Sequence, residues 1–120
     1  MEPEFEYREV GGKVVAHLTG GSVRDERDAT DLVGNASFGG AHYVLVDAER
    51  LPPDFFDLSS GFAGEVLQKF SNYRLTLVVV GYDQRNASDS LRAMIGESNR
   101  GATAWFVDTV EEALASVAAG

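Results

Sequence analysis

The sequence predicts an α/β domain in which a mixed, mostly parallel β-sheet carries an N-terminal β-hairpin and about four helices. From Tyr43 onward, short apolar segments alternate with segments whose apolar residues recur at helical spacing. A Gly-Gly pair joins two earlier strand-like segments. A chain of 120 residues without cysteine is long enough for one hydrophobic core and too short for two, so residues 1–120 are expected to form a single domain.

The first elements are expected to be two strands and a helix. Residues 4–10 and 13–18 alternate in polarity, and Gly11-Gly12 between them suits the two-residue turn of a hairpin. Residues 24–40 then begin with acidic side chains and end in two glycines. Their apolar side chains follow the i, i+3, i+4, i+7 pattern of a helix face: Ala29, Leu32, Val33 and Ala36.

The remainder reads as three strands, each followed by a helix. Residues 43–47 are apolar up to the closing aspartate, as in a strand covered on both faces. Residues 75–81 give the strongest signal for a central strand, and residues 103–108 form the last strand. The helix faces carry Phe62, Ala63, Val66, Leu67 and Phe70, then Leu91, Met94 and Ile95, then Val110, Ala113, Leu114 and Val117. Ser88 and Thr109 are expected N-caps, and Gly101 is placed to end the middle helix.

Aspartates follow three of these strands. Right-handed crossovers place Asp47, Asp83 and Asp108 just beyond the carboxyl ends of parallel strands, the edge where open α/β sheets bind ligands. The carboxylates suit Mg²⁺, but aspartate is also common wherever a strand passes into a turn or a helix cap. The two histidines lack a third ligand at metal spacing, so we expect no metal site.

Composition and missing motifs narrow the function. The net charge of −9 argues against nucleic acid and anionic membranes as partners, because both need clustered Lys and Arg. No apolar run approaches the ~20 residues of a membrane span, and the acidic N-terminus differs from a signal peptide, which predicts a cytoplasmic protein. Without cysteine or a recognisable nucleophile, metal or nucleotide motif, we expect neither an enzyme nor a bound cofactor.

The segment from Asp54 to Phe70 concentrates unusual backbone chemistry at one helix start. Two prolines precede it, Asp57, Ser59 or Ser60 can accept hydrogen bonds from the first turn, and Gly61 permits close approach. Such a helix start suits a phosphate, either bound from solution or attached to a serine. The plain structural interpretation is that one serine caps the helix.

The same segment contains the adjacent aromatic residues Phe55 and Phe56. Either both rings fill the core beneath the loop, or one of them is exposed as a contact for a partner or ligand.

The long segment "LPPDFFDLSSGFAGEVLQKFSNYRLTLVVVG", together with "ESNRG" and "FVDTVEEAL", resembles the bacterial family known as domain of unknown function 4180. The resemblance runs over nearly the whole chain. It implies a small cytosolic bacterial protein and brings no established activity.

A more distant similarity is to the STAS domains of anti-sigma factor antagonists, which share the element order. In that family an Asp-Ser-Ser/Thr-Gly-type turn opens a helix, and its serine or threonine is reversibly phosphorylated. Asp57, Ser59, Ser60 and Gly61 stand in the matching place, with Leu58 as one extra residue. The resemblance leaves open whether Ser59, Ser60 or neither accepts a phosphate.

These observations lead to three hypotheses of different classes. The first is a non-enzymatic regulatory or protein-interaction domain, STAS-like in form, with a protein partner and a serine switch near Ser59. The alternative is a small-molecule or metal-binding protein that uses the carboxylates at the strand ends, either for binding alone or as an enzyme. The third is a self-associating module that forms a homodimer through the open edge of the N-terminal hairpin.

Overall fold

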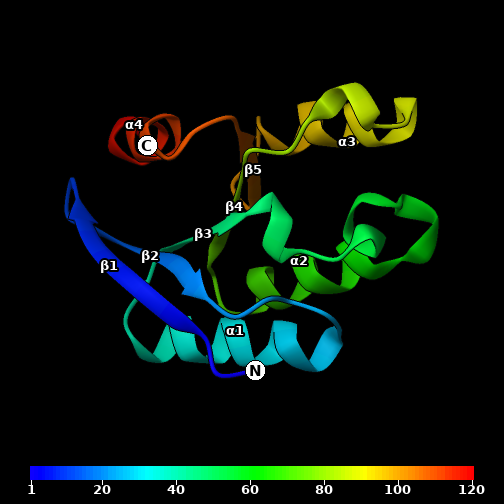
Figure 1. Cartoon of the computed structure of the whole chain (residues 1–120). Coiled ribbons are helices and arrows are strands. Elements are labelled where there is room, and N and C mark those ends of the chain that lie inside the picture. The colour runs from blue at the N-terminus through cyan, green and yellow to red at the C-terminus, as the bar shows by residue number, and fades with distance from the viewer.

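The computed structural model describes residues 1–120 and contains one five-stranded sheet with the strands in chain order (Figure 1). The strands are β1 (Glu4–Val10), β2 (Lys13–Gly20), β3 (Tyr43–Asp47), β4 (Thr76–Val80) and β5 (Ala104–Val107). The helices are α1 (Glu26–Phe38), α2 (Phe62–Asn72), α3 (Asp89–Ser98) and α4 (Val110–Ala119). β1 pairs antiparallel with β2, and every other neighbouring pair is parallel. The predicted fold class and element order are therefore confirmed.

The N-terminal hairpin turns at Gly11 and Gly12, which have φ angles of 57° and 82°. Both angles lie in the left-handed region, which residues with a side chain rarely adopt. Two such residues in a row form the turn whose twist matches that of the flanking strands. The register follows directly, with Val10 opposite Lys13 and Tyr7 opposite Ala16.

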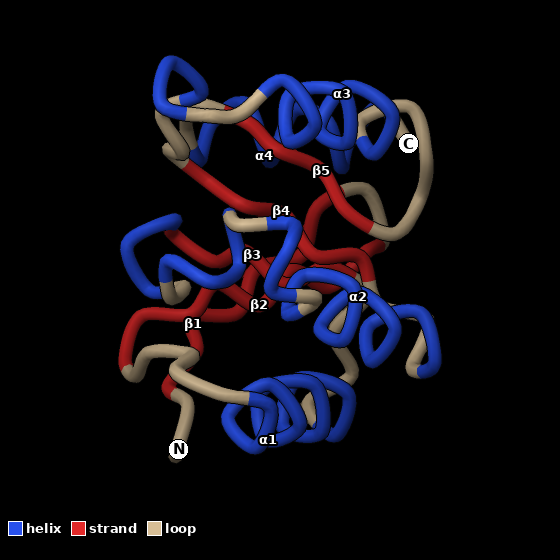
Figure 2. Tube along the Cα trace, turned by 90° about the vertical axis from the view of Figure 1, so that its right-hand side faces the viewer, coloured by secondary structure: helices blue, strands red, loops and turns tan.

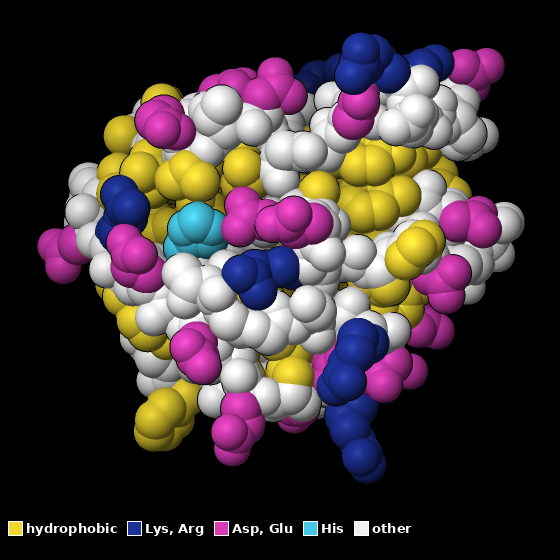
Figure 3. Space-filling view, in the orientation of Figure 1, with side chains coloured by type: hydrophobic (Ala, Val, Ile, Leu, Met, Phe, Trp, Pro, Cys, Tyr) yellow, Lys and Arg dark blue, Asp and Glu magenta, His cyan; other side chains and the backbone are white.

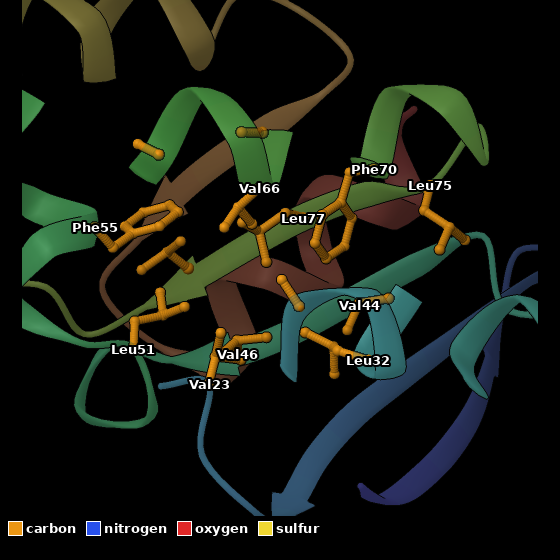
Figure 4. Close-up of a cluster of buried hydrophobic side chains, with 14 of the residues drawn as sticks. Val23, Leu32, Val44, Val46, Leu51, Phe55, Val66, Phe70, Leu75 and Leu77 are labelled. Atoms are coloured by element: carbon orange, nitrogen blue, oxygen red, sulfur yellow. The ribbon is translucent and has the colours of Figure 1, made fainter. Parts of the chain in front are cut away.

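The helices cover the two faces of the sheet unequally (Figure 2). The crossover helices α1, α2 and α3 all lie on one face, because successive right-handed crossovers that step across the sheet in one direction stay on the same side. Their shared core contains 23 buried residues, part of which is shown in Figure 4. Only α4 packs on the other face, over a cluster of seven. The first face therefore holds the main core.

Strand burial follows the same arrangement. Val44 and Val46 of β3 face the main core, whereas Leu45 faces α4, and all three are fully buried. A strand buried on both faces has no polar side to alternate with, which explains its continuous apolar sequence.

The expected helix caps are present. Ser88 Oγ accepts from Leu91 N–H at 3.1 Å, and Thr109 Oγ1 accepts from Glu112 N–H at 3.1 Å. The expected stop at Gly101 is wrong, because α3 already ends at Ser98 with Asn99 as C-cap. The Asn99 side chain accepts from Phe106 N–H at 2.7 Å, so a contact with β5 draws the chain out of the helix early.

Candidate functional site

The connection between β3 and α2, residues 48–61 and hereafter the β3–α2 loop, is held in place by its apolar side chains. It winds through three short 3₁₀ turns, the second of which begins at Pro53. Leu51 and Phe55 are 7% and 0% exposed and reach into the main core, as Figure 4 shows. Burial of these two side chains anchors the loop on the sheet, so that its polar residues stay at the surface.

Arg50 adds a polar anchor that sequence analysis missed. Its guanidinium donates to the backbone oxygens of Thr19 and Gly21, each at 2.8 Å, and its own carbonyl accepts from Val23 N–H at 2.7 Å. These bonds tie the start of the loop to the end of β2. No sequence pattern marks Arg50, because its acceptors are backbone atoms about thirty residues away.

Ser60 is engaged on both sides of its hydroxyl. Ser60 Oγ donates to the carbonyl of Asp54 at 2.7 Å and accepts from Phe62 N–H at 3.1 Å, the first amide of α2. It is the only side chain that accepts a bond from the first turn of this helix. Ser60 therefore closes the turn and starts the helix, which is a structural role.

Ser59 has one side-chain contact and is exposed. Its hydroxyl donates to Asp57 Oδ1 at 2.6 Å, and the same oxygen accepts from Ser59 N–H at 3.1 Å. Asp57 thus caps the short 3₁₀ turn before α2 and not α2 itself, and the hydroxyl of Ser59 caps neither. Of the three expected caps, only Ser60 serves the helix. Of the two serines in this turn, Ser59 makes fewer hydrogen bonds through its hydroxyl.

The residue directly before α2 is Gly61, with φ of 76°. This left-handed conformation redirects the chain from the 3₁₀ turn into the helix, and the space around its Cα is open. Ser59, Ser60 and Gly61 are all exposed. The helix start and its positive dipole end are consequently accessible from solution.

The two adjacent phenylalanines of the loop lie in different environments. Phe55 is fully buried and meets Phe106 in the core, so it is not the exposed contact that was one of its two expected roles. Phe56 is half-buried and stacks on Tyr82 at a centroid distance of 4.0 Å. The stack links the β3–α2 loop to the segment after β4, and burial raises the pKa of the Tyr82 hydroxyl.

Two of the three strand-end aspartates meet at one edge of the sheet. Asp47 and Asp108 line an open hollow of about 320 Å³, together with Glu49 and the backbone around Gly81. On the face seen in Figure 3, carboxylates lie beside a histidine and a basic side chain near the centre. Parallel pairing of β3, β4 and β5 produces this neighbourhood, as expected.

Asp47 is already partnered on its other side. His17 Nε2 lies 3.3 Å from Asp47 Oδ2, and Arg50 Nε lies 3.9 Å from the same oxygen. No local sequence pattern links His17 with Asp47, because that pairing depends on the register between β2 and β3.

Asp83 does not join the other two aspartates. It folds back on Arg85, whose guanidinium donates to both carboxylate oxygens at 2.8–3.2 Å. Hydrogen bonds from the Arg85 side chain lower the pKa of Asp83 to about 2. No group of three or more His, Cys, Asp or Glu side chains comes close enough to hold a metal ion.

The chain matches the family described as Domain of unknown function (DUF4180) over residues 11–117. It belongs to this family. The family match includes the whole β3–α2 loop and the strand-end aspartates, and it begins after β1. No curated protein and no solved structure matches the chain. None of the helices combines the length and apolar character needed to cross a membrane.

Proposed function

We propose that this member of the DUF4180 family is a non-enzymatic, cytoplasmic protein-interaction domain of regulatory type. Its interaction surface is the β3–α2 loop with the start of α2, and the hydroxyl of Ser59 is the switch. The observation that carries the proposal is the exposed Ser59–Asp57 hydrogen bond of 2.6 Å, set on a firmly anchored loop beside a helix N-terminus.

The chemistry of that bond supports a switch. Asp57 holds the turn by accepting from both the hydroxyl and the amide of Ser59. A phosphoryl group on Ser59 removes the hydroxyl donor and sets a dianion beside the carboxylate, whose repulsion opens the turn. The anchors at Leu51 and Phe55 confine that change to the exposed part of the loop.

The different hydrogen bonds of the two serines support Ser59 over Ser60 as the phosphorylated residue. Modification of Ser60 would break the bond to Asp54 and the cap of α2 together, and so would disturb the fold. Modification of Ser59 leaves both in place. The distant similarity of this turn to STAS domains agrees with a phosphoacceptor here but does not decide between the two positions.

Mass spectrometry of the protein purified from its native host tests the switch. We expect a phosphoserine at position 59 that is absent from Ser59→Ala and still present in Ser60→Ala that retains its fold. Pull-downs with the wild type, Ser59→Asp and Ser59→Ala should then differ in the proteins captured. Lack of any phosphate over varied growth conditions, with identical captures by all three baits, would refute the switch.

A second candidate function is ligand binding at the strand ends, favoured by the hollow between Asp47 and Asp108. Two carboxylates at an open α/β edge suit a divalent cation or a small cationic ligand. Titration with Mg²⁺ and Ca²⁺ by calorimetry tests it, with Asp108→Asn as the matched control. Binding heat that disappears in the variant supports this function, and no heat at millimolar metal argues against it.

A further inference from the structure

The sheet ends in a strand that is unpaired on one side. β1 has only β2 as a neighbour, and no other segment runs along its outer side (Figures 1 and 2). It is seven residues long, contains no proline and is almost entirely exposed. An edge strand of this kind offers a row of free N–H and C=O groups to another chain.

Hydrogen bonding within the hairpin decides which residues present those groups. The N–H of Val14 donates to Nδ1 of His42 at 2.9 Å, and the C=O of Val14 accepts from the backbone N–H of His42 at 2.8 Å. Both backbone groups of Val14 therefore point toward β3. Glu9 lies opposite Val14 and therefore directs its own N–H and C=O away from β2. Because the direction alternates along a strand, Tyr7 and Phe5 do the same.

This alternation limits how a second copy can pair with β1. In an antiparallel pair of two β1 strands, a residue whose N–H and C=O point outward must lie opposite another such residue. Because these residues alternate along the strand, the two-fold axis that relates the copies must pass at a residue and not between two residues. With the axis at Tyr7, the two Tyr7 residues oppose each other and Phe5 opposes Glu9. Glu6 of each copy then opposes Arg8 of the other, on the same face of the joined sheet.

The charges favour this register over its neighbours. The axis at Tyr7 creates two opposite-charge pairs and brings no like charges directly together. An axis at any other central residue places like charges opposite each other. An axis at Phe5 pairs Glu4 with Glu6, and an axis at Glu6, Arg8 or Glu9 pairs that residue with its own copy. Glu6 and Arg8 form an exposed ion pair of 3.2 Å within one chain, and because neither is buried, each can also reach its counterpart in a second copy.

Exposed aromatic rings lie on the same side of β1 as α1. Tyr7 is 46% exposed and its ring lies against Gly39, where a side chain would clash with the hydroxyl. The neighbouring residue Phe38, at the end of α1, is 96% exposed. A second copy paired along β1 brings its own Phe5 and Tyr7 to this place, which would cover rings that are otherwise left in water.

We propose that two copies of this chain pair antiparallel through β1 about Tyr7 and form one continuous ten-stranded sheet, with reciprocal Glu6–Arg8 contacts across the interface. This interface is separate from the β3–α2 loop and does not rest on the function proposed above. The residues that carry it lie before the family match, so the proposal concerns this chain and not the family as a whole.

A charge-swap experiment tests the register. Sedimentation velocity over the micromolar range should show a reversible monomer–dimer equilibrium for the wild type. Glu6→Arg and Arg8→Glu each turn both cross-strand pairs into like-charge pairs and should weaken dimerisation by about tenfold or more. The double variant E6R/R8E restores opposite charges and should recover the wild-type association.

Amide hydrogen exchange gives an independent readout of the same interface. Exchange at Phe5, Tyr7 and Glu9 should slow as protein concentration rises, whereas amides already bonded to β2 should not respond. Circular dichroism confirms that each variant is folded, which the exposure of both charged residues favours. A wild type that remains monomeric, a dimer insensitive to the single swaps, or a double variant that fails to recover would each overturn the proposal.

Discussion

The rings of Phe56 and Tyr82 stack face to face, with their planes 5° apart. The two residues come from different connections, one after β3 and one after β4, and the stack holds these connections together above the carboxyl ends of the strands. It therefore fixes the β3–α2 loop from the side, while Phe55 fixes it from below.

This stack should be measurable as a coupling energy. Phe56→Ala and Tyr82→Ala should each lower the free energy of unfolding, and together they should cost about 0.5–1.5 kcal/mol less than the sum of the single losses. Urea unfolding of the four proteins in the cycle gives this value. Tyr73→Ala, which removes a half-exposed ring with no aromatic partner, is the matched control. Additive losses for Phe56 and Tyr82 would show that the stack contributes nothing.

The two serines of the loop should differ in stability. Ser60→Ala removes a cap and a bond to the Asp54 carbonyl and should cost about 1 kcal/mol. Ser59→Ala removes one exposed hydrogen bond and should cost less than about 0.5 kcal/mol. Chemical denaturation of both variants checks the order. A larger loss for Ser59→Ala would contradict the assignment of Ser60 as the structural serine.

Asp28 is the one charged side chain that is buried, at 2% exposure. Its Oδ2 accepts from the Nε and the backbone N–H of Arg24, at 2.9 and 3.0 Å, and the Met1 amino group lies 3.1 Å from Oδ1. The Arg24 guanidinium holds the pKa of Asp28 well below its ordinary value, because its hydrogen bonds outweigh the effect of burial.

A carboxyl group with a lowered folded-state pKa stabilises the fold above its unfolded-state pKa of about 4, and this stability is lost as the pH falls further. Asp28→Asn should therefore lose about 1–3 kcal/mol at neutral pH and depend less on pH below about 4 than the wild type does. Urea unfolding across a pH series measures both effects. Asp89→Asn, which removes an exposed carboxylate, serves as the control. Parallel pH profiles for wild type and Asp28→Asn would contradict the prediction.

Gly61 and Gly64 should respond in opposite directions to alanine. Gly61 has φ of 76°, so Gly61→Ala should cost about 1 kcal/mol for backbone reasons alone. Gly64 lies within α2 with no atom near the position of a Cβ, so Gly64→Ala should stabilise the protein by roughly 0.5–1 kcal/mol. Thermal unfolding of the two variants tests this contrast. A stabilising Gly61→Ala would contradict the left-handed conformation at Gly61, and a destabilising Gly64→Ala would contradict the open space at Gly64.

Local sequence chemistry predicted most of the fold. Gly11-Gly12, Ser88 and Thr109 act within four residues of their own position, so their turn and caps were recognisable from the sequence. The predicted helix end at Gly101 was wrong, because the side chain of Asn99 is hydrogen-bonded to Phe106 across a loop. The exposure of Ser59 and Ser60 agreed with a surface site, but which serine is structural depended on the path of the loop.

Apolar periodicity and turn residues by themselves determined the element order and the exposed helix start, because both depend on bonds between near neighbours in the chain. The mixed sheet then followed from that element order and the right-handed rule for crossovers. Only the tertiary structure decided that Phe56 meets Tyr82, that Asp47 meets His17 and Arg50, and that Asp83 stands apart. Contacts between residues far apart in the chain depend on strand register and on how loops pack, and no local pattern encodes those distances.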